Sequence, residues 1–184
     1  MSILKIRLFG DPVLRQQANE VDEFDARLAK LAGDMLDTMR DAPGVGLAAP
    51  QVGILKRLFV WEVEEDGGAI VNPVVTDTSE ELQEGEEGCL SFPGLFYPLD
   101  RPLRVQVGYQ DLGGDHHEVQ LTGFHARVWL HEIDHLNGIL FIDHLAKHDK
   151  KDAMRRMREH RLELGLDAPE PQRPGNLLLD RRSL

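Results

Sequence analysis

The chain has 184 residues, of which 41% are hydrophobic and 29% charged, a balance that is ordinary for one globular domain. Its formal net charge of -11 at pH 7 argues against DNA or RNA as the main ligand, since a nucleic acid would require a basic face. No stretch approaches the ~20 apolar residues of a membrane span, and the N-terminus lacks the apolar core of a signal peptide, so we expect a cytoplasmic protein that binds neither membrane nor DNA.

The first predicted element is an amphipathic helix over residues 24–41, where apolar side chains recur at three- and four-residue steps. Asp25 is placed to cap the N-terminus of this helix. Asp41, Ala42, Pro43 and Gly44 are expected to end it. A loop of small residues, GVGLAAPQ (44–51), then follows.

The middle of the chain predicts antiparallel β structure that is interrupted by loops. The expected strands are residues 54–64, 69–76, 103–111 and 117–122. Glycine-containing turns at 66–68 and 113–115 would join them into two hairpins. The acidic run of residues 80–87 lies between the hairpins and predicts an exposed loop.

Two further helices are expected in the C-terminal half of the chain. The first runs from residue 122 or 123 to about Leu136 and is closed by Asn137 and Gly138. The second, residues 147–164, is highly charged. The pattern indicates an α+β domain over residues 1–165, in which antiparallel sheets pack around the central helix, with one helix N-terminal and one C-terminal to them. Residues 166–184 are rich in proline and predict a loosely ordered tail.

The segment HEIDH (131–135) places two histidines one turn apart on one face of the central helix. Both imidazoles can therefore reach one metal ion, and Glu132 between them can contact a water on that ion. An open catalytic site needs a third protein ligand, and the only cysteine of the chain is the candidate because a thiolate binds borderline and soft divalent ions. We therefore predict a metal site formed by Cys89, His131 and His135.

Two other interpretations of these residues stay open. A metalloprotease would also use two helical histidines and a glutamate, with a third ligand downstream of the helix, for which Asp143 and His144 are available. A binding or structural module would close the coordination sphere with a fourth protein ligand and leave no exchangeable water.

Three segments of the chain, taken in order, resemble those of one family, the peptide deformylases. GVGLAAPQ (44–51) is similar to the family's glycine-alanine loop that ends in glutamine. EGCLS (87–91) is similar to its cysteine motif, and HEIDHLNG (131–138) to its histidine motif. The likeness spans roughly residues 3–164. An inactive relative is disfavoured because Gln51, Cys89 and Glu132 are all present.

The resemblance implies a hydrolase that removes the formyl group from the N-terminal formyl-methionine of newly made polypeptides and releases formate. It implies one ferrous ion (Fe2+) per chain, although Cys/His/His ligation alone would equally suggest zinc, and Zn2+, Ni2+ or Co2+ can substitute in the purified protein. In the expected mechanism a metal-bound hydroxide attacks the formyl carbon, with Glu132 as general base and then general acid. Gln51, through its side-chain amide, and Leu90, through its backbone N–H, would donate to the developing oxyanion.

The resemblance also implies how the peptide substrate is bound. Gly46 would pair with the main chain of the substrate, as an added strand does. Val45, Phe124 and Val128 are candidates for the apolar slot that takes the methionine side chain. Glu87 would orient the site or hold an amide of the substrate.

Three features stay open in the sequence. Arg101 either binds the substrate further along the peptide or is a plain surface arginine. Gly85 stands where relatives often carry a bulky apolar residue, so the shape of the pocket is not fixed. The basic helix 147–164 either contacts the ribosome near the exit tunnel, as the resemblance suggests, or is a solvated helix with i,i+4 ion pairs.

Overall fold

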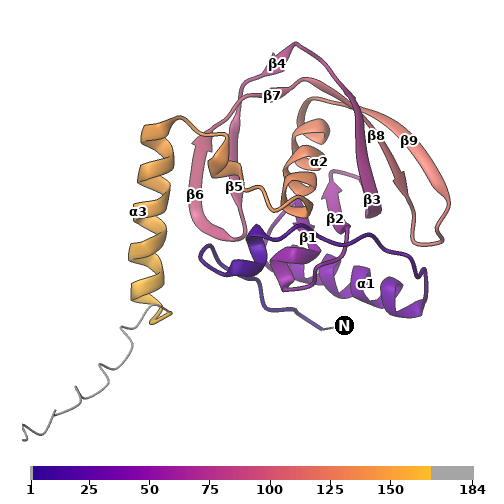
Figure 1. The fold of residues 1–184 in the computed structure, drawn as a ribbon, viewed down its shortest axis with the longest axis horizontal. Helices are drawn as coiled ribbons and strands as arrows, with labels where there is room; N and C mark the ends of the chain where they lie inside the picture. The colour runs from indigo at the N-terminus through magenta and orange to yellow at the C-terminus, as the bar shows by residue number, and fades with distance from the viewer. Residues whose placement is uncertain (1, 167–184) are drawn as a thin grey trace, which may run out of the picture.

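The protein is described by a computed structural model over residues 2–166, in which helix α2 (Gly123–Leu136) lies between a five-stranded sheet and a two-stranded hairpin (Figure 1). The strands of the larger sheet are, in spatial order, β1 (Gly46–Ala48), β2 (Leu58–Val63), β3 (Asp66–Thr78), β8 (Arg104–Gln110) and β9 (His116–Thr122). The hairpin consists of β5 (Glu86–Cys89) and β6 (Phe92–Pro98). A separate two-stranded sheet is formed by β4 (Leu82–Gln83) and β7 (Arg101–Pro102). All these pairs are antiparallel, so the predicted α+β class is confirmed.

Helix α1 (Ala26–Asp41) covers one face of the larger sheet. It begins at Ala26, two residues later than predicted, and Asp25 is its cap as expected. The carboxylate of Asp25 accepts hydrogen bonds from the backbone N–H groups of Arg27 and Leu28, at 2.9 and 3.0 Å. The buried side chains of this layer are Leu28, Ala32, Met35 and Met39 from the helix, and Leu47, Leu58, Val60 and Val71 from the sheet.

Helix α2 packs against the opposite face of the same sheet. Its Trp129, Ile133 and Leu136 share an apolar cluster with Phe59 and Trp61 of β2. The intervening β2 residues face α1 instead, so this strand is buried on both faces. That double burial explains why five of its six residues are apolar, with Glu62 the exception, instead of apolar and polar residues alternating.

The turn between β2 and β3 was predicted at the wrong place. It lies at Glu64 and Glu65, where Glu64 adopts a positive φ of 57°, rather than at 66–68. Gly67 lies inside the sheet opposite Glu62, and a Cβ there would be 2.8 Å from the carbonyl oxygen of Trp61. The glycine therefore permits close packing within the strand pair instead of forming the turn.

Other boundaries also differ from the prediction, and β3 is longer at both ends than the expected strand 69–76. β2 begins at Leu58 instead of residue 54. The acidic run 80–87 is not simply an exposed loop, because it contains β4 and the start of β5, and the side chain of Glu87 is buried. The β5–β6 hairpin that follows was not expected, since its strands show no clear alternation in sequence.

Helix α3 (Lys147–Glu163) confirms the predicted helix 147–164 to within one residue, and only its Ala153 and Met157 are buried. Arg155 pairs with Asp152 and Glu159 along the helix, as a solvated helix would. Contact with the ribosome stays a prediction, which co-sedimentation of the protein with ribosomes tests. The expected tail 166–184 lies outside the described residues except for Leu166.

Within residues 2–166, no helix combines the length and apolar character needed to cross a membrane. The cytoplasmic location stays a prediction.

Asp143, at the end of the short helix η3 (Phe141–Asp143), joins three segments of the chain. Its carboxylate accepts hydrogen bonds from Arg15 in η1 (Pro12–Arg15), from Lys150 Nζ at 2.7 Å, and from the backbone N–H of Leu140 at 3.0 Å. Partial burial opposes ionisation, but the hydrogen bonds from Arg15 and Lys150 outweigh it and hold the pKa of Asp143 well below its ordinary value.

Asp143→Asn is expected to lower the free energy of unfolding at pH 7 by roughly 1 kcal/mol, since partly exposed ion pairs are screened by solvent. Because the folded-state pKa is depressed, this contribution is fully present above the unfolded pKa of 3.8 and declines as the pH falls below it. Urea unfolding of both proteins between pH 7 and pH 3 measures the difference. Asp77→Asn, at an exposed aspartate of β3, is the control; an undiminished difference at pH 3 would contradict the assignment.

Candidate metal centre

The end of β5 and the middle of α2 bring Cys89, His131 and His135 together. The Sγ atom of Cys89 lies 3.2 Å from Nε2 of His135, and the ligand atoms of all three residues lie within 4.8 Å of one another. Both histidines are buried and the cysteine is half-buried. The structure thus places side by side the three residues that the sequence singled out as metal ligands.

The chemistry of these donors fits a divalent cation. Burial lowers the pKa of His135 well below 6.5, so its imidazole is neutral and Nε2 can offer a lone pair. Nδ1 of His131 lies 3.0 Å from a carboxylate oxygen of Glu87, which leaves Nε2 free for a ligand. One thiolate and two imidazoles with room for a further ligand is the donor set of an open catalytic site.

The two ligands that a metalloprotease would use lie elsewhere. Asp143 is bound to Arg15 and Lys150, and His144 Nε2 lies 2.8 Å from Asp134 Oδ2. Within the described part of the chain, neither residue belongs to the Cys/His/His group, and no fourth histidine, cysteine or carboxylate completes it. This arrangement argues against both alternatives, the metalloprotease and the closed structural site.

Glu132 is buried beside β1. A Cβ on Gly46 would collide with the Glu132 carboxylate, so only glycine at position 46 leaves room for it. Burial raises the pKa of Glu132 to about 7. Its Oε2 atom has no hydrogen-bond partner among the described residues, which is uncommon for a buried carboxylate and points to a partner that the protein does not supply.

Gln51, on the short helix η2 (Ala49–Val52), is buried with its amide in a fixed orientation. Its Oε1 accepts a hydrogen bond from the backbone N–H of Ala48 at 2.8 Å, so Nε2 must point the other way. Nε2 lies 3.4 Å from Sγ of Cys89, an ordinary distance to sulfur, and 3.3 Å from Oγ of Ser91, a long contact. Leu90 follows the cysteine directly, and its side chain lies against Gly44.

An open cavity of about 590 Å³ leads to this group of residues. Its walls come from the segment before and into β1, from the β5–β6 hairpin and from α2. The predicted site residues among its lining are Val45, Gly46, Gln51, Glu87, Cys89, Leu90, Phe124, Val128, His131 and Glu132. Phe96 on β6, 64% exposed, also lines it and was missed, because the hairpin that carries it was not expected.

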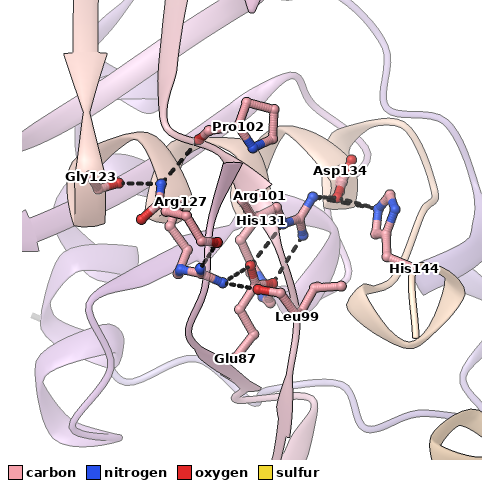
Figure 2. Close-up of polar contacts among 10 residues, drawn as sticks. Glu87, Leu99, Arg101, Pro102, Gly123, Arg127, His131, Asp134 and His144 are labelled. Atoms are coloured by element: carbon pink, nitrogen blue, oxygen red, sulfur yellow. Dashed lines mark hydrogen bonds and ion pairs between the residues drawn. The ribbon is translucent and has the colours of Figure 1, made fainter. Parts of the chain in front are cut away.

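Figure 2 shows that Glu87 is the centre of a buried polar network, with its side chain 4% exposed. Arg101 donates to both of its oxygens, at 2.8 and 3.0 Å, and Arg127 donates to Oε1 at 3.1 Å. Burial opposes ionisation of Glu87, but the hydrogen bonds from His131 and Arg101 outweigh it and lower the pKa to about 2. An ionised carboxylate can only accept, so Nδ1 of His131 carries the hydrogen in their contact.

Arg101 is not the surface arginine that the sequence left open, since it is 5% exposed. Its guanidinium also donates to Asp134 at 2.7 Å, and Arg101 is not among the residues that line the cavity. Its donors are committed to carboxylates within the protein.

Arg127, 4% exposed on α2, is a residue of the site that the sequence analysis did not single out. It lies four residues before His131 and therefore on the same helix face, which is the signal that was available. Its Nη2 would be 2.9 Å from a Cβ on Gly85. The space that Gly85 leaves is thus filled by the guanidinium of Arg127.

Comparison with known proteins agrees with this geometry. A family model described as polypeptide deformylase matches residues 3–151. A peptide deformylase of Parafrankia sp. is 51% identical over 160 residues, which cover 86% of this chain and 87% of that protein. The crystal structure of peptide deformylase from Thermotoga maritima has a TM-score of 0.78 and 46% identity, covering 79% of this chain and 99% of that one. The crystal structure of a peptide deformylase from Synechococcus elongatus in complex with actinonin has a TM-score of 0.81 and 38% identity, covering 85% of this chain and 88% of that one.

Titration of the metal-free protein with Co2+ is expected to produce a thiolate-to-cobalt charge-transfer absorption, because the sulfur of Cys89 is within reach of the same ion as the two imidazoles. Cys89→Ala should abolish the band, and His135→Ala should weaken binding by more than ~100-fold, beyond the effect typical of residues that only support a ligand. His144→Ala, outside the group, is the control. Retention of metal by Cys89→Ala and its loss in His144→Ala would instead favour the protease arrangement.

Proposed function

This chain belongs to the polypeptide deformylase family and is an enzyme of that class, and from this premise we propose that it removes the formyl group from the N-terminal formyl-methionine of newly made polypeptides. The observation that carries the proposal is a Cys/His/His group with both histidines buried, next to a carboxylate whose Oε2 has no partner among the described residues, in the wall of an open cavity. All of the groups involved lie inside residues 1–165, the proposed catalytic domain.

We propose that Cys89, His131 and His135 hold one ferrous ion per chain, which zinc, nickel or cobalt can replace in the purified protein. When bound, the cation supplies Lewis-acid polarisation of the formyl oxygen and of the attacking water. The half-buried position of the sulfur and the buried imidazoles support ligation by three protein groups with one position open to the cavity.

Glu132 is the proposed general base and then general acid. It takes a proton from the water that attacks the formyl carbon, and it delivers that proton to the amine nitrogen as the carbon–nitrogen bond of the formamide breaks. Two observations support this role: Glu132 lines the cavity, and its Oε2 has no partner among the described residues. The products are formate and a free N-terminal amine.

Gln51 and Leu90 are the proposed donors to the formyl oxygen as it gains negative charge. The amide of Gln51 is prevented from flipping by the hydrogen bond from the backbone of Ala48 to its Oε1, so Nε2 faces Cys89 and Ser91. The contact of Nε2 with Oγ of Ser91, at 3.3 Å, is long enough to be exchanged for a better acceptor. A donor held in this way needs no reorganisation when the charge develops.

The substrate peptide is proposed to extend the larger sheet. β1 is an edge strand of that sheet, and Gly46 lies at its first position, where its backbone faces the cavity. Val45, Phe124 and Val128 line the cavity and are the proposed slot for the methionine side chain. Glu87 is proposed to orient His131, and Arg101 to hold Glu87 in place rather than to touch the peptide.

Glu132→Gln is expected to keep the metal and to lower kcat by roughly 10²–10⁴-fold, because the side chain keeps its shape but can no longer accept a proton. Metal content and formate release are the two measurements. Glu118→Gln, at an exposed position of β9, is the matched control. Loss of metal in Glu132→Gln would show that its carboxylate is needed for the ion and not for proton transfer.

The direct test of the function is formate release from formyl-Met-Ala-Ser by iron-loaded and zinc-loaded protein, prepared without air. We expect formate from both forms, with the iron form losing activity in air because ferrous iron is oxidised. Acetyl-Met-Ala-Ser is the control, and cleavage of its peptide bonds would support a protease. Equal rates of formate release with iron and zinc, both unchanged by exposure to air, would contradict the proposal that the ion is ferrous iron.

A further inference from the structure

Arg127 occupies a buried position between the metal-binding helix and the strands around it (Figure 2). Its guanidinium donates to Oε1 of Glu87 at 3.1 Å, to the backbone oxygen of Leu99 at 2.6 Å and to that of Gln83 at 3.0 Å. The three acceptors come from β5, from the connection between β6 and β7, and from β4. One side chain of α2 therefore holds three separate segments.

Two of the elements that Arg127 joins, β5 and α2, carry the proposed metal ligands. Glu87 lies two positions before Cys89 on β5, and it accepts the hydrogen bond from Nδ1 of His131 at 3.0 Å. Arg127 and His131 stand one turn apart on α2, so both reach Glu87 from one rigid element. The spacing between guanidinium and imidazole is thus set by the helix itself.

Arg101 and Arg127 hold Glu87 in different ways. Arg101 comes from β7 and donates to both carboxylate oxygens, which fixes the plane of the carboxylate. Arg127 donates only to Oε1, the oxygen that His131 does not contact. Its contact adds a second donor to Oε1 from the same helix that carries His131, so Glu87 is held against α2 as well as against β7.

We infer that Arg127 is a positioning residue for the metal ligand His131: by holding Glu87 against α2, it keeps the imidazole oriented with Nε2 toward Cys89. The inference deepens the proposed function and rests on it for the identity of the site. It assigns Arg127 no contact with the substrate's reacting atoms.

Gly85 is part of the same arrangement. A Cβ on Gly85 would lie 2.9 Å from Nη2 of Arg127. The backbone oxygen of Gly85 accepts a hydrogen bond from the N–H of Leu99 at 2.8 Å. The φ angle of Gly85 is not in the left-handed region, so alanine fits its backbone. Gly85→Ala would therefore crowd the guanidinium without removing any donor.

The experiment compares Arg127→Met, which keeps the length of the stem and removes every donor, with Arg127→Lys and Gly85→Ala. Zn2+ affinity of the full chain is measured by competition with a chromophoric chelator, beside the melting temperature of the metal-free protein. Arg127→Met is expected to bind zinc about ten-fold or more weakly, the range seen when the partner of a ligand is disturbed. Arg127→Lys should recover part of the loss, and Gly85→Ala should show a smaller loss of the same sign.

Arg57→Met is the matched control. Arg57 donates to Asn137 Oδ1 and to the backbone oxygen of Pro73, both at 2.9 Å, and the structure shows no contact between it and Glu87. Its substitution should lower stability and leave zinc affinity unchanged. If Arg127 only stabilises the fold, Arg127→Met will likewise lower stability and leave zinc affinity unchanged.

The outcomes separate the inference from the function on which it rests. Zinc affinity within two-fold of wild type in Arg127→Met overturns the inference; if that variant does not fold, unchanged affinity in both Arg127→Lys and Gly85→Ala overturns it. In formate release, a fall in kcat with KM nearly constant supports positioning of the ligand. A wild-type protein that releases no formate from formyl-Met-Ala-Ser refutes the proposed function, while the affinity comparison still decides the role of Arg127.

Discussion

The ionised carboxylate of Glu87 is the constraint on which the rest of the site depends. A charge this deeply buried is tolerated only when it is paired and fully hydrogen-bonded, and Glu87 receives donors from Arg101, Arg127 and His131. Removing one partner of such a buried pair typically destabilises a protein by ~3–5 kcal/mol, because the remaining charge is left without compensation. Satisfying Glu87 therefore fixes β5 against α2, and the sulfur of Cys89 is carried to the two histidines as a result.

On the cavity side the arrangement leaves a polar group unsatisfied. The carboxylate of Glu132 fits beside β1 because position 46 has no side chain, and its Oε2 has no partner among the described residues. Stability would favour a matched or apolar group here, and the unpaired oxygen agrees with the proposed role of Glu132 in proton transfer. The two carboxylates thus differ by environment: Glu87 is surrounded by cationic donors, whereas the buried Glu132 has one oxygen without a partner among the described residues.

The placement of other polar residues limits what the site can do. Asp143 and His144 were possible ligands of a metalloprotease, but their side chains pair with Arg15, Lys150 and Asp134 instead. The overall charge of the chain is -11, yet the interior around the cavity holds two guanidiniums. They form ion pairs with Glu87 and Asp134.

What the sequence alone determined was local in origin. Asp25 and the apolar spacing after it predicted α1, and histidines four residues apart predicted a metal-binding face on α2, because helix geometry repeats over a few residues. Only the tertiary structure decided that Gly67 lies within a strand pair, that Arg101 is buried, and that Arg127 fills the space beside Gly85. Glu87 meets Arg101 across 14 positions and Arg127 across 40, and no periodicity in a single sequence specifies which distant charges will be buried together.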